Sequence, residues 1–125
     1  MRAVLLSIKP EFAHKIFDGT KKYEFRKKVF KDETVRKVIV YSSFPERKVL
    51  GEFEIDSILN GTPREIWRLT KDASGITQTF YNEYFENKEM AYAIKVASVC
   101  EYKIQKNLID YNVRFAPQSF VYVEV

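Results

Sequence analysis

The chain has 125 residues, of which 46% are hydrophobic and 30% are charged, with only four glycines and four prolines. This composition predicts one folded domain over residues 1–125 and excludes a disordered or fibrous protein. The formal net charge is +4, and one cysteine with one histidine is too few ligands for a structural zinc site. We therefore expect neither a metal nor a cofactor.

The first 26 residues predict a strand, a helix and a second strand. Ala3–Ile8 is almost wholly apolar, as in a strand that is buried on both faces. Pro10 suits the first turn of a helix, apolar residues recur at helical spacing over residues 12–17, and Gly19 can end the helix in a left-handed conformation. Apolar and polar residues then alternate over residues 22–26, which predicts a strand with one polar face.

Two further strands follow in the first half of the chain. Val35–Tyr41 and Val49–Leu59 are rich in apolar and β-branched residues, and Ser42–Pro45 between them has the composition of a turn. Gly51 inside the later strand indicates a bulge or a close approach by another part of the chain.

Two helices are predicted next. Thr62 and Glu65 form a capping-box pattern around Pro63. The buried stripe of this helix is expected to be Ile66, Trp67 and Leu69. A second helix, capped by Thr77, carries aromatic residues at helical spacing that predict core packing: Phe80, Tyr81, Tyr84 and Phe85.

Met90–Val99 and Phe120–Val125 predict the last two strands, so strands outnumber helices. The order of elements lacks the strict strand–helix alternation of a doubly wound parallel sheet. We therefore predict an α+β fold, in the form of a small mixed β-barrel with flanking helices.

Four stretches of sequence together carry a family resemblance. They are residues 7–13 (SIKPEFA), 16–26 (IFDGTKKYEFR), the pair 41–43 and 49–53 (YSS and VLGEF), and 116–120 (APQSF). In this order they resemble the ASCH domain of the PUA-like superfamily over nearly the whole chain. The resemblance implies a PUA-like β-barrel with a cleft beside the first helix that binds RNA. Family members are mostly described as RNA-binding or regulatory modules linked to translation and transcription, and some relatives are hydrolases.

Positive charge coincides with this family core. Residues 1–48 carry a net charge of +7 and residues 49–125 carry −3. Clustered lysines and arginines bind polyanions by neutralising phosphates and releasing counterions, so RNA or a nucleotide is the expected partner. A solvated basic surface and a protein module that meets an acidic partner are the alternatives.

The candidate nucleic-acid-binding residues centre on the basic segment. Lys9 precedes the first helix, whose N-terminus favours anions, and Lys21 and Arg26 can hold phosphate while Glu24 accepts a hydrogen bond from a base. A salt bridge between Glu24 and Arg26 is the structural alternative. Polar residues at predicted strand ends complete the candidate set: Ser42, Ser43, Gln118 and Ser119.

Other residues receive lesser roles. Lys27, Lys28 and Lys31 extend the basic segment and can steer a polyanion. Core packing is expected for Trp67, Tyr81 and Tyr84, although such rings can also stack on bases, and His14 is expected to be exposed and without a role.

A hydrolase that uses the same cleft is the alternative function, and its catalytic residues would be Lys21 and Glu24. The relatives that act on an acetylated cytidine resemble this chain in the glycine-to-arginine segment, but they carry a threonine nucleophile where Glu24 stands. A carboxylate cannot replace an alkoxide in acyl transfer without another mechanism, although Thr20 lies nearby. Cleavage of RNA could instead pair Lys21 with Glu24 or Tyr81.

The sequence also predicts where the protein works. No apolar run approaches the roughly 20 residues that a membrane-spanning helix needs. Lys9 interrupts the apolar stretch near the N-terminus, and Cys100 has no second cysteine for an intramolecular disulfide. We expect no membrane partner and a cytoplasmic location.

Overall fold

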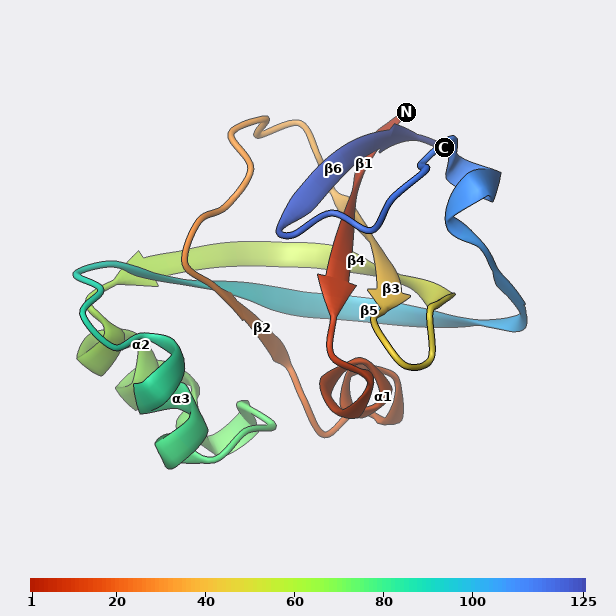
Figure 1. Cartoon of the computed structure of the whole chain (residues 1–125). Coiled ribbons are helices and arrows are strands. Elements are labelled where there is room, and N and C mark those ends of the chain that lie inside the picture. The colour runs from red at the N-terminus through yellow and green to blue at the C-terminus, as the bar shows by residue number, and fades with distance from the viewer.

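The computed structural model describes residues 1–125 and contains three α-helices and a six-stranded sheet (Figure 1). The helices are α1 (Pro10–Asp18), α2 (Pro63–Thr70) and α3 (Gln78–Tyr84). The strands are β1 (Arg2–Ile8), β2 (Tyr23–Arg26), β3 (Lys37–Ser42), β4 (Lys48–Gly61), β5 (Ala91–Lys106) and β6 (Phe120–Glu124). No helix combines the length and hydropathy needed to cross a membrane. The predicted α+β class with flanking helices is confirmed.

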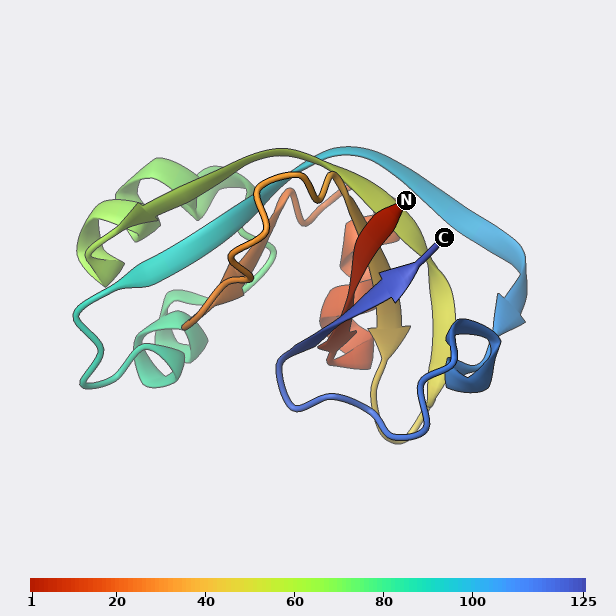
Figure 2. The same cartoon turned by 90° about the horizontal axis from the view of Figure 1, so that it is seen from above.

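The sheet has the strand order β2-β5-β4-β3-β1-β6. Only β1 and β3 pair in parallel, and the connection between them carries α1 and β2. The long strands β4 and β5 span the molecule (Figure 2). β2, α2 and α3 gather at one end of these two strands, and β1, β3, β6 and α1 gather at the other.

The predicted barrel is corrected by this topology, because the sheet bends but does not close. β2 and β6 are its two edges, and no backbone ladder joins them. A side chain bridges the gap instead: Arg26 on β2 donates a hydrogen bond from Nη2 to the carbonyl oxygen of Ser119 (2.6 Å), which immediately precedes β6. The two edges are therefore held near each other without being part of one continuous barrel.

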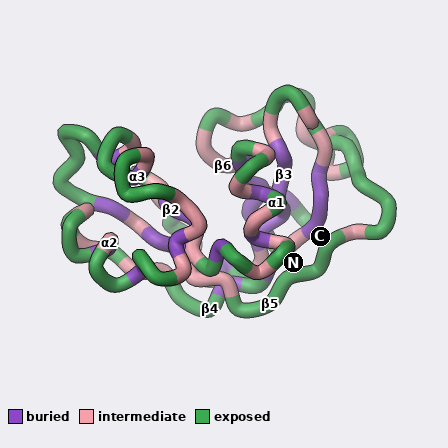
Figure 3. Tube along the Cα trace, turned by 90° about the horizontal axis from the view of Figure 1, so that it is seen from below, coloured by how far each residue is buried: buried purple, intermediate pink, exposed green.

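The core has three parts that follow the sequence patterns. On β1, Val4 and Leu6 pack under α1, whereas Ala3 and Leu5 face a second cluster on the other side of the sheet. A third cluster lies beneath α2 and α3 and includes Phe25. Figure 3 shows the buried residues along the strands and the inner sides of the helices. The prediction that the first strand is buried on both faces is confirmed.

The ends of the first two helices match the sequence signals. Gly19 has φ 86° and caps α1 in the left-handed region. Thr62 and Glu65 make both hydrogen bonds of the capping box that begins α2. The expected buried stripe of α2 is wrong at Leu69, which is 61% exposed. Thr70 is buried in its place, because it lies one turn after Ile66 on the same face of the helix, and its hydroxyl group donates to the Ile66 carbonyl oxygen (2.7 Å).

β5 is seven residues longer at its C-terminal end than the Met90–Val99 strand that the sequence predicts, and it ends at Lys106. Most residues from 97 to 106 are exposed on both faces, so they lack the hydrophobic alternation that marks a strand. Backbone pairing with β4 holds this extension in place. A short 3-10 helix that the sequence did not indicate, Leu108–Tyr111, follows it.

The close approach expected at Gly51 is present. The β3–β4 and β4–β5 registers both shift here, and a Cβ atom at Gly51 would lie closer than 3.0 Å to the Cys100 carbonyl oxygen and the Phe17 ring. Neither the backbone of β5 nor the packed ring of Phe17 on α1 can move aside easily for a larger side chain. Only glycine therefore fits between β5 and α1 at this point.

We predict that Gly51→Ala lowers the free energy of unfolding by about 2 kcal/mol, because the added methyl group overpacks this crossing. The matched control is Gly61→Ala, whose Cβ would meet its nearest neighbours at 3.6 Å, an ordinary contact distance. Urea unfolding measured by circular dichroism compares the two variants with the wild type. Equal stability of the two variants would contradict the prediction.

Candidate functional site

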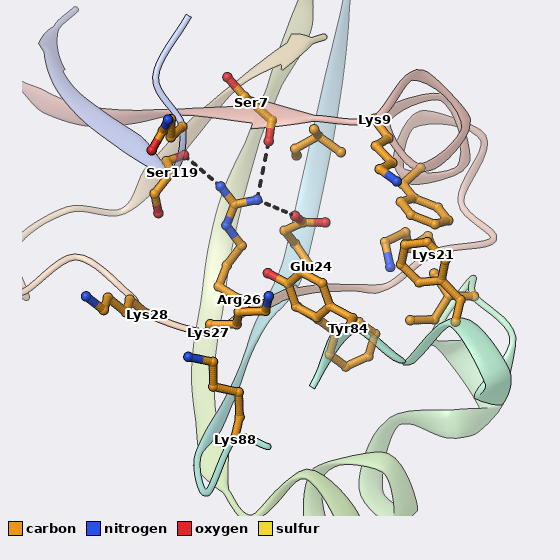
Figure 4. Close-up of a pocket in the computed structure, with 16 residues that line it drawn as sticks. Ser7, Lys9, Lys21, Glu24, Arg26, Lys27, Lys28, Tyr84, Lys88 and Ser119 are labelled. Carbon is orange, nitrogen blue, oxygen red and sulfur yellow. Dashed lines mark hydrogen bonds and ion pairs between the residues drawn. The ribbon is translucent and has the colours of Figure 1, made fainter. Parts of the chain in front are cut away.

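A cleft of about 500 Å³ opens between the two ends of the molecule. Four parts of the chain line it: the end of β1 with the start of α1, β2 with the loop after it, α3 with its flanking residues, and the segment before β6. Figure 4 shows the side chains that point into it. Six cationic side chains line the cleft against a single carboxylate, that of Glu24.

Lys21 lies at the base of the cleft and is only 2% exposed. Its Nζ donates a hydrogen bond to the Ser74 carbonyl oxygen (2.8 Å) and lies 5.2 Å from the ring centre of Phe12 and 4.8 Å from that of Phe25. Burial lowers the pKa of Lys21 to about 8, although the nearby Glu24 carboxylate opposes the shift. A substantial fraction of this amine is therefore neutral at weakly alkaline pH.

The loop before α3 fixes the position of Lys21. The Lys22 backbone N–H donates to the Ala73 carbonyl (2.9 Å), which ties the start of β2 to this loop. Gly75, with φ 69°, packs so tightly on Lys21 that a Cβ atom there would lie closer than 3.0 Å to the Lys21 side chain. The ammonium group is therefore held by backbone on one side and by aromatic rings on the other.

Glu24 and Arg26 form a buried ion pair on β2. Arg26 Nη1 lies 3.2 Å from Glu24 Oε2, and the two side chains are 12% and 7% exposed. Arg26 also donates to the carbonyl oxygens of Ser7 (3.3 Å) and Ser119 (2.6 Å), so its guanidinium joins β1, β2 and the segment before β6 (Figure 4). The sequence left two alternatives for this pair, contact with nucleic acid or a structural salt bridge. The geometry favours the salt bridge, because most of the Arg26 hydrogen-bond donors already have partners within the protein.

The rim of the cleft carries cations that are not neutralised. Lys9, Lys27, Lys28 and Lys88 line the cleft and form no ion pair with a carboxylate. Lys9 Nζ lies 5.0 Å from the ring centre of Phe80, and Lys27 Nζ lies 4.6 Å from that of Tyr84. The rim therefore combines positive charge that has no carboxylate partner with aromatic surface.

Tyr84 is the aromatic residue that stands between the rim and the buried pair. It is half-buried, and this burial raises the pKa of its hydroxyl group. The phenol therefore remains protonated at neutral pH and can donate a hydrogen bond into the cleft.

Six of the eight predicted site residues line this one cleft: Lys9, Lys21, Glu24, Arg26, Gln118 and Ser119. Ser42 and Ser43 do not line it. Ser42 is fully buried at the end of β3. Both serines therefore fall outside the candidate site.

The sequence reasoning missed Lys88, Ser7 and the wall formed by Phe80. Lys88 lies in the loop after α3, where nothing in the local sequence separates it from any surface lysine. Ser7 interrupts an apolar strand, which was a usable signal for a polar function. Phe80 was predicted as core, yet it faces the cleft while Tyr81 on the same helix is buried.

Several lesser candidates lie elsewhere. The Tyr81 hydroxyl donates to the Pro63 carbonyl (2.6 Å) and does not line the cleft, so it cannot act there with Lys21. The Thr20 hydroxyl donates to Asp18 (2.6 Å) on an exposed turn. His14 pairs with Glu46 (2.9 Å) outside the cleft. No three His, Cys, Asp or Glu side chains lie together in a way that could hold a metal ion.

These features define a small α+β domain with a basic cleft between two ends of a bent sheet. The family model of the ASCH domain matches residues 6–99. The chain therefore belongs to the ASCH domain family, as the resemblance in its sequence predicted.

The chain is also similar to known proteins in sequence and in fold. The chain is 31% identical over 121 residues to the protein named large ribosomal subunit protein uL22 of Ureaplasma parvum serovar 3. The aligned region covers 97% of this chain but only 39% of that protein. It is 27% identical over 92 residues to the ASCH domain-containing ribonuclease of Zymomonas mobilis, covering 74% of the chain and 62% of that protein. The crystal structure of ASCH from Zymomonas mobilis superposes with a TM-score of 0.89 at 24% identity, over 98% of this chain and 87% of that chain.

We predict that Arg26→Ala destabilises the fold by about 3 kcal/mol or more, because it leaves the Glu24 carboxylate buried without its partner. In a Glu24→Gln background the same substitution should cost less, by about 1 to 3 kcal/mol, since no charge is orphaned. Urea unfolding of the wild type, both single variants and the double variant measures this coupling. If the changes in unfolding free energy of the two single variants simply add in the double variant, the ion pair does not account for the stability that Arg26 provides.

Proposed function

We propose that the cleft binds single-stranded RNA, or a nucleotide-sized part of it. The observation that carries the proposal is the division of charge in the cleft. The inner charges of Glu24 and Arg26 satisfy each other and the backbone, whereas the rim lysines have no carboxylate partner. Uncompensated lysines around an aromatic hollow are the arrangement that binds a phosphate backbone and stacks a base.

The shape of the cleft supports an unpaired base as the bound group. A hollow of about 500 Å³ accommodates a nucleotide-sized group, and Phe80 and Tyr84 offer ring surfaces at its wall. Glu24 uses Oε2 for the ion pair and keeps its other oxygen for the amino group of a base. The base would therefore point toward β2, with the sugar and phosphate outward on the rim lysines.

The similarity to a protein named as a ribonuclease supports RNA as the polyanion, in preference to an acidic protein surface. A regulatory role in translation or transcription would follow from such binding, and it forms part of the proposal. The concave, aromatic wall also fits a planar base better than the flat acidic face of a protein partner.

We predict that Lys88→Ala weakens binding of single-stranded RNA about fivefold at low salt, because one phosphate contact is lost. The logarithm of affinity falls as the logarithm of salt concentration rises, and this negative slope should become shallower by about 0.7. Lys103→Ala is the matched control, since Lys103 is exposed on β5 and does not line the cleft. Fluorescence anisotropy of labelled RNA measures both. A wild type that binds no RNA at low salt would refute the proposal.

Cleavage of RNA in the same cleft is a second candidate function, and it rests on Lys21. A buried lysine whose pKa is lowered to about 8 by desolvation, at the base of an open cleft, is poised to accept a proton near neutral pH. Acyl transfer is less well supported. The carboxylate of Glu24 stands where the nucleophile would be and is paired with Arg26, and Thr20 lies on an exposed turn outside the cleft.

This reaction needs a second pose, in which a ribose instead of a base enters the cleft. The neutral Lys21 amine then takes the proton of the ribose 2′-hydroxyl group. The freed oxygen attacks the adjacent phosphorus, and the bond from phosphorus to the 5′-oxygen of the next nucleotide breaks. The departing oxygen takes a proton from water, and the products are a 2′,3′-cyclic phosphate and a 5′-hydroxyl end. Lys21 afterwards returns its proton to solvent, which leaves the protein unchanged.

We predict that any cleavage rate rises with pH through a midpoint near 8, because only the neutral form of Lys21 accepts the proton. Lys21→Met should abolish cleavage, whereas Lys88→Ala should mainly weaken substrate binding. Gel analysis of end-labelled RNA between pH 6 and 9 measures the profile, and RNA with a single 2′-deoxy substitution controls for attack by that hydroxyl. Cleavage that persists in Lys21→Met would exclude this role.

A further inference from the structure

A second pocket, of about 470 Å³, lies on the far side of Lys9 and Phe80 from the cleft. Its lining includes Lys15 and Lys71 together with the loop of residues 74–77 before α3. Lys9, Phe12, Ile76 and Phe80 line both hollows. The two pockets are therefore neighbours that share one wall, and we call this wall, formed by those four residues, the ridge.

The second pocket is also basic. Lys9, Lys15 and Lys71 line it against one carboxylate, Glu11. Glu11 pairs with Lys15 within α1 (3.6 Å), and Lys15 further donates to the Gly75 carbonyl oxygen (3.2 Å). Lys9 and Lys71 form no ion pair, so the positive charge that remains lies at the ridge and at the outer edge of the pocket.

The start of α1 stands beside the ridge. Lys9 is the N-cap of this nine-residue helix and provides no side-chain hydrogen bond to the first turn. The amide groups of that turn are therefore left for solvent or a ligand, and the positive end of the helix dipole lies next to the Lys9 ammonium group. An anion that crosses from one hollow to the other would meet amide and ammonium groups together.

We infer that the second pocket holds the neighbouring nucleotide of the same RNA strand. The linking phosphate crosses the ridge at Lys9, and the next phosphate lies against Lys71. The inference rests on the proposed function, and it adds that the ligand is a single-stranded oligonucleotide of at least two residues. Phe80, on the shared wall, separates the two bases and offers a ring face at the crossing.

The test compares ligands of increasing length on matched variants. Isothermal titration calorimetry at low salt measures wild type, Lys71→Ala, Lys88→Ala and Lys103→Ala against ribonucleoside monophosphates and ribo-oligonucleotides of two, three and six residues. Wild-type affinity should rise from one residue to two or three. Lys71→Ala should lose about fivefold for the oligonucleotides and nothing for the monophosphates, whereas Lys88→Ala should weaken both.

The outcomes separate this inference from the function on which it rests. Monophosphate binding without any gain from further residues, or oligonucleotide binding that Lys71→Ala leaves unchanged, overturns the second subsite alone. Equal weakening of monophosphates and oligonucleotides by Lys71→Ala overturns it as well, because Lys71 would then contact the first nucleotide. Absence of binding to any of these ligands overturns both the subsite and the proposed function.

Discussion

The Arg26 guanidinium joins β2 to β1 and to the segment before β6, and no backbone ladder connects β2 to either of these neighbouring strands. Its hydrogen bonds reach the carbonyl oxygens of Ser7 and Ser119 and the carboxylate of Glu24. An open sheet with two free edges would leave the cleft between them without a defined width. Because a planar fork with several donors fixes direction as well as distance, this one side chain sets how far the edges stand apart. The dimensions of the cleft therefore depend on a structural arginine.

This constraint divides the charges of the site into two groups with different tasks. The inner group is buried, mutually paired or bound to backbone carbonyls, and it shapes the cleft. The outer group consists of lysines on the rim whose ammonium groups have no carboxylate partner. Breaking a buried ion pair to form a new contact costs several kcal/mol, about 3 to 5. Solvated lysines can neutralise a phosphate without that cost, and counterions are then released to solvent. In the proposed functions, binding therefore belongs to the rim and proton transfer to the base of the cleft.

Local signals in the sequence predicted local structure well. The stretches that carry the family resemblance predicted most of the residues that line the cleft, although Ser42 and Ser43 on one of those stretches do not reach it. Pro10, Gly19 and the capping box at Thr62 act within one helical turn, so their effect could be read from neighbouring residues. The open sheet could not be predicted, because it depends on contacts between residues separated by 93 positions, as in the bond from Arg26 to Ser119. Lys88 reaches the cleft for the same nonlocal reason.

The environment of Lys21 places a limit on where a phosphate can lie. A phosphate beside its ammonium group would favour the charged form and move its pKa back toward the usual range. In the pose proposed for binding, the RNA backbone stays on the rim, away from the rings of Phe12 and Phe25 that surround Nζ, and the pKa of Lys21 stays near 8. The uncompensated lysines lie on that rim, and Lys9 lies at the ridge toward the second pocket. In the proposed functions, the same separation of charge would hold a polyanion at the rim and leave the buried amine able to accept a proton until a ribose enters the cleft.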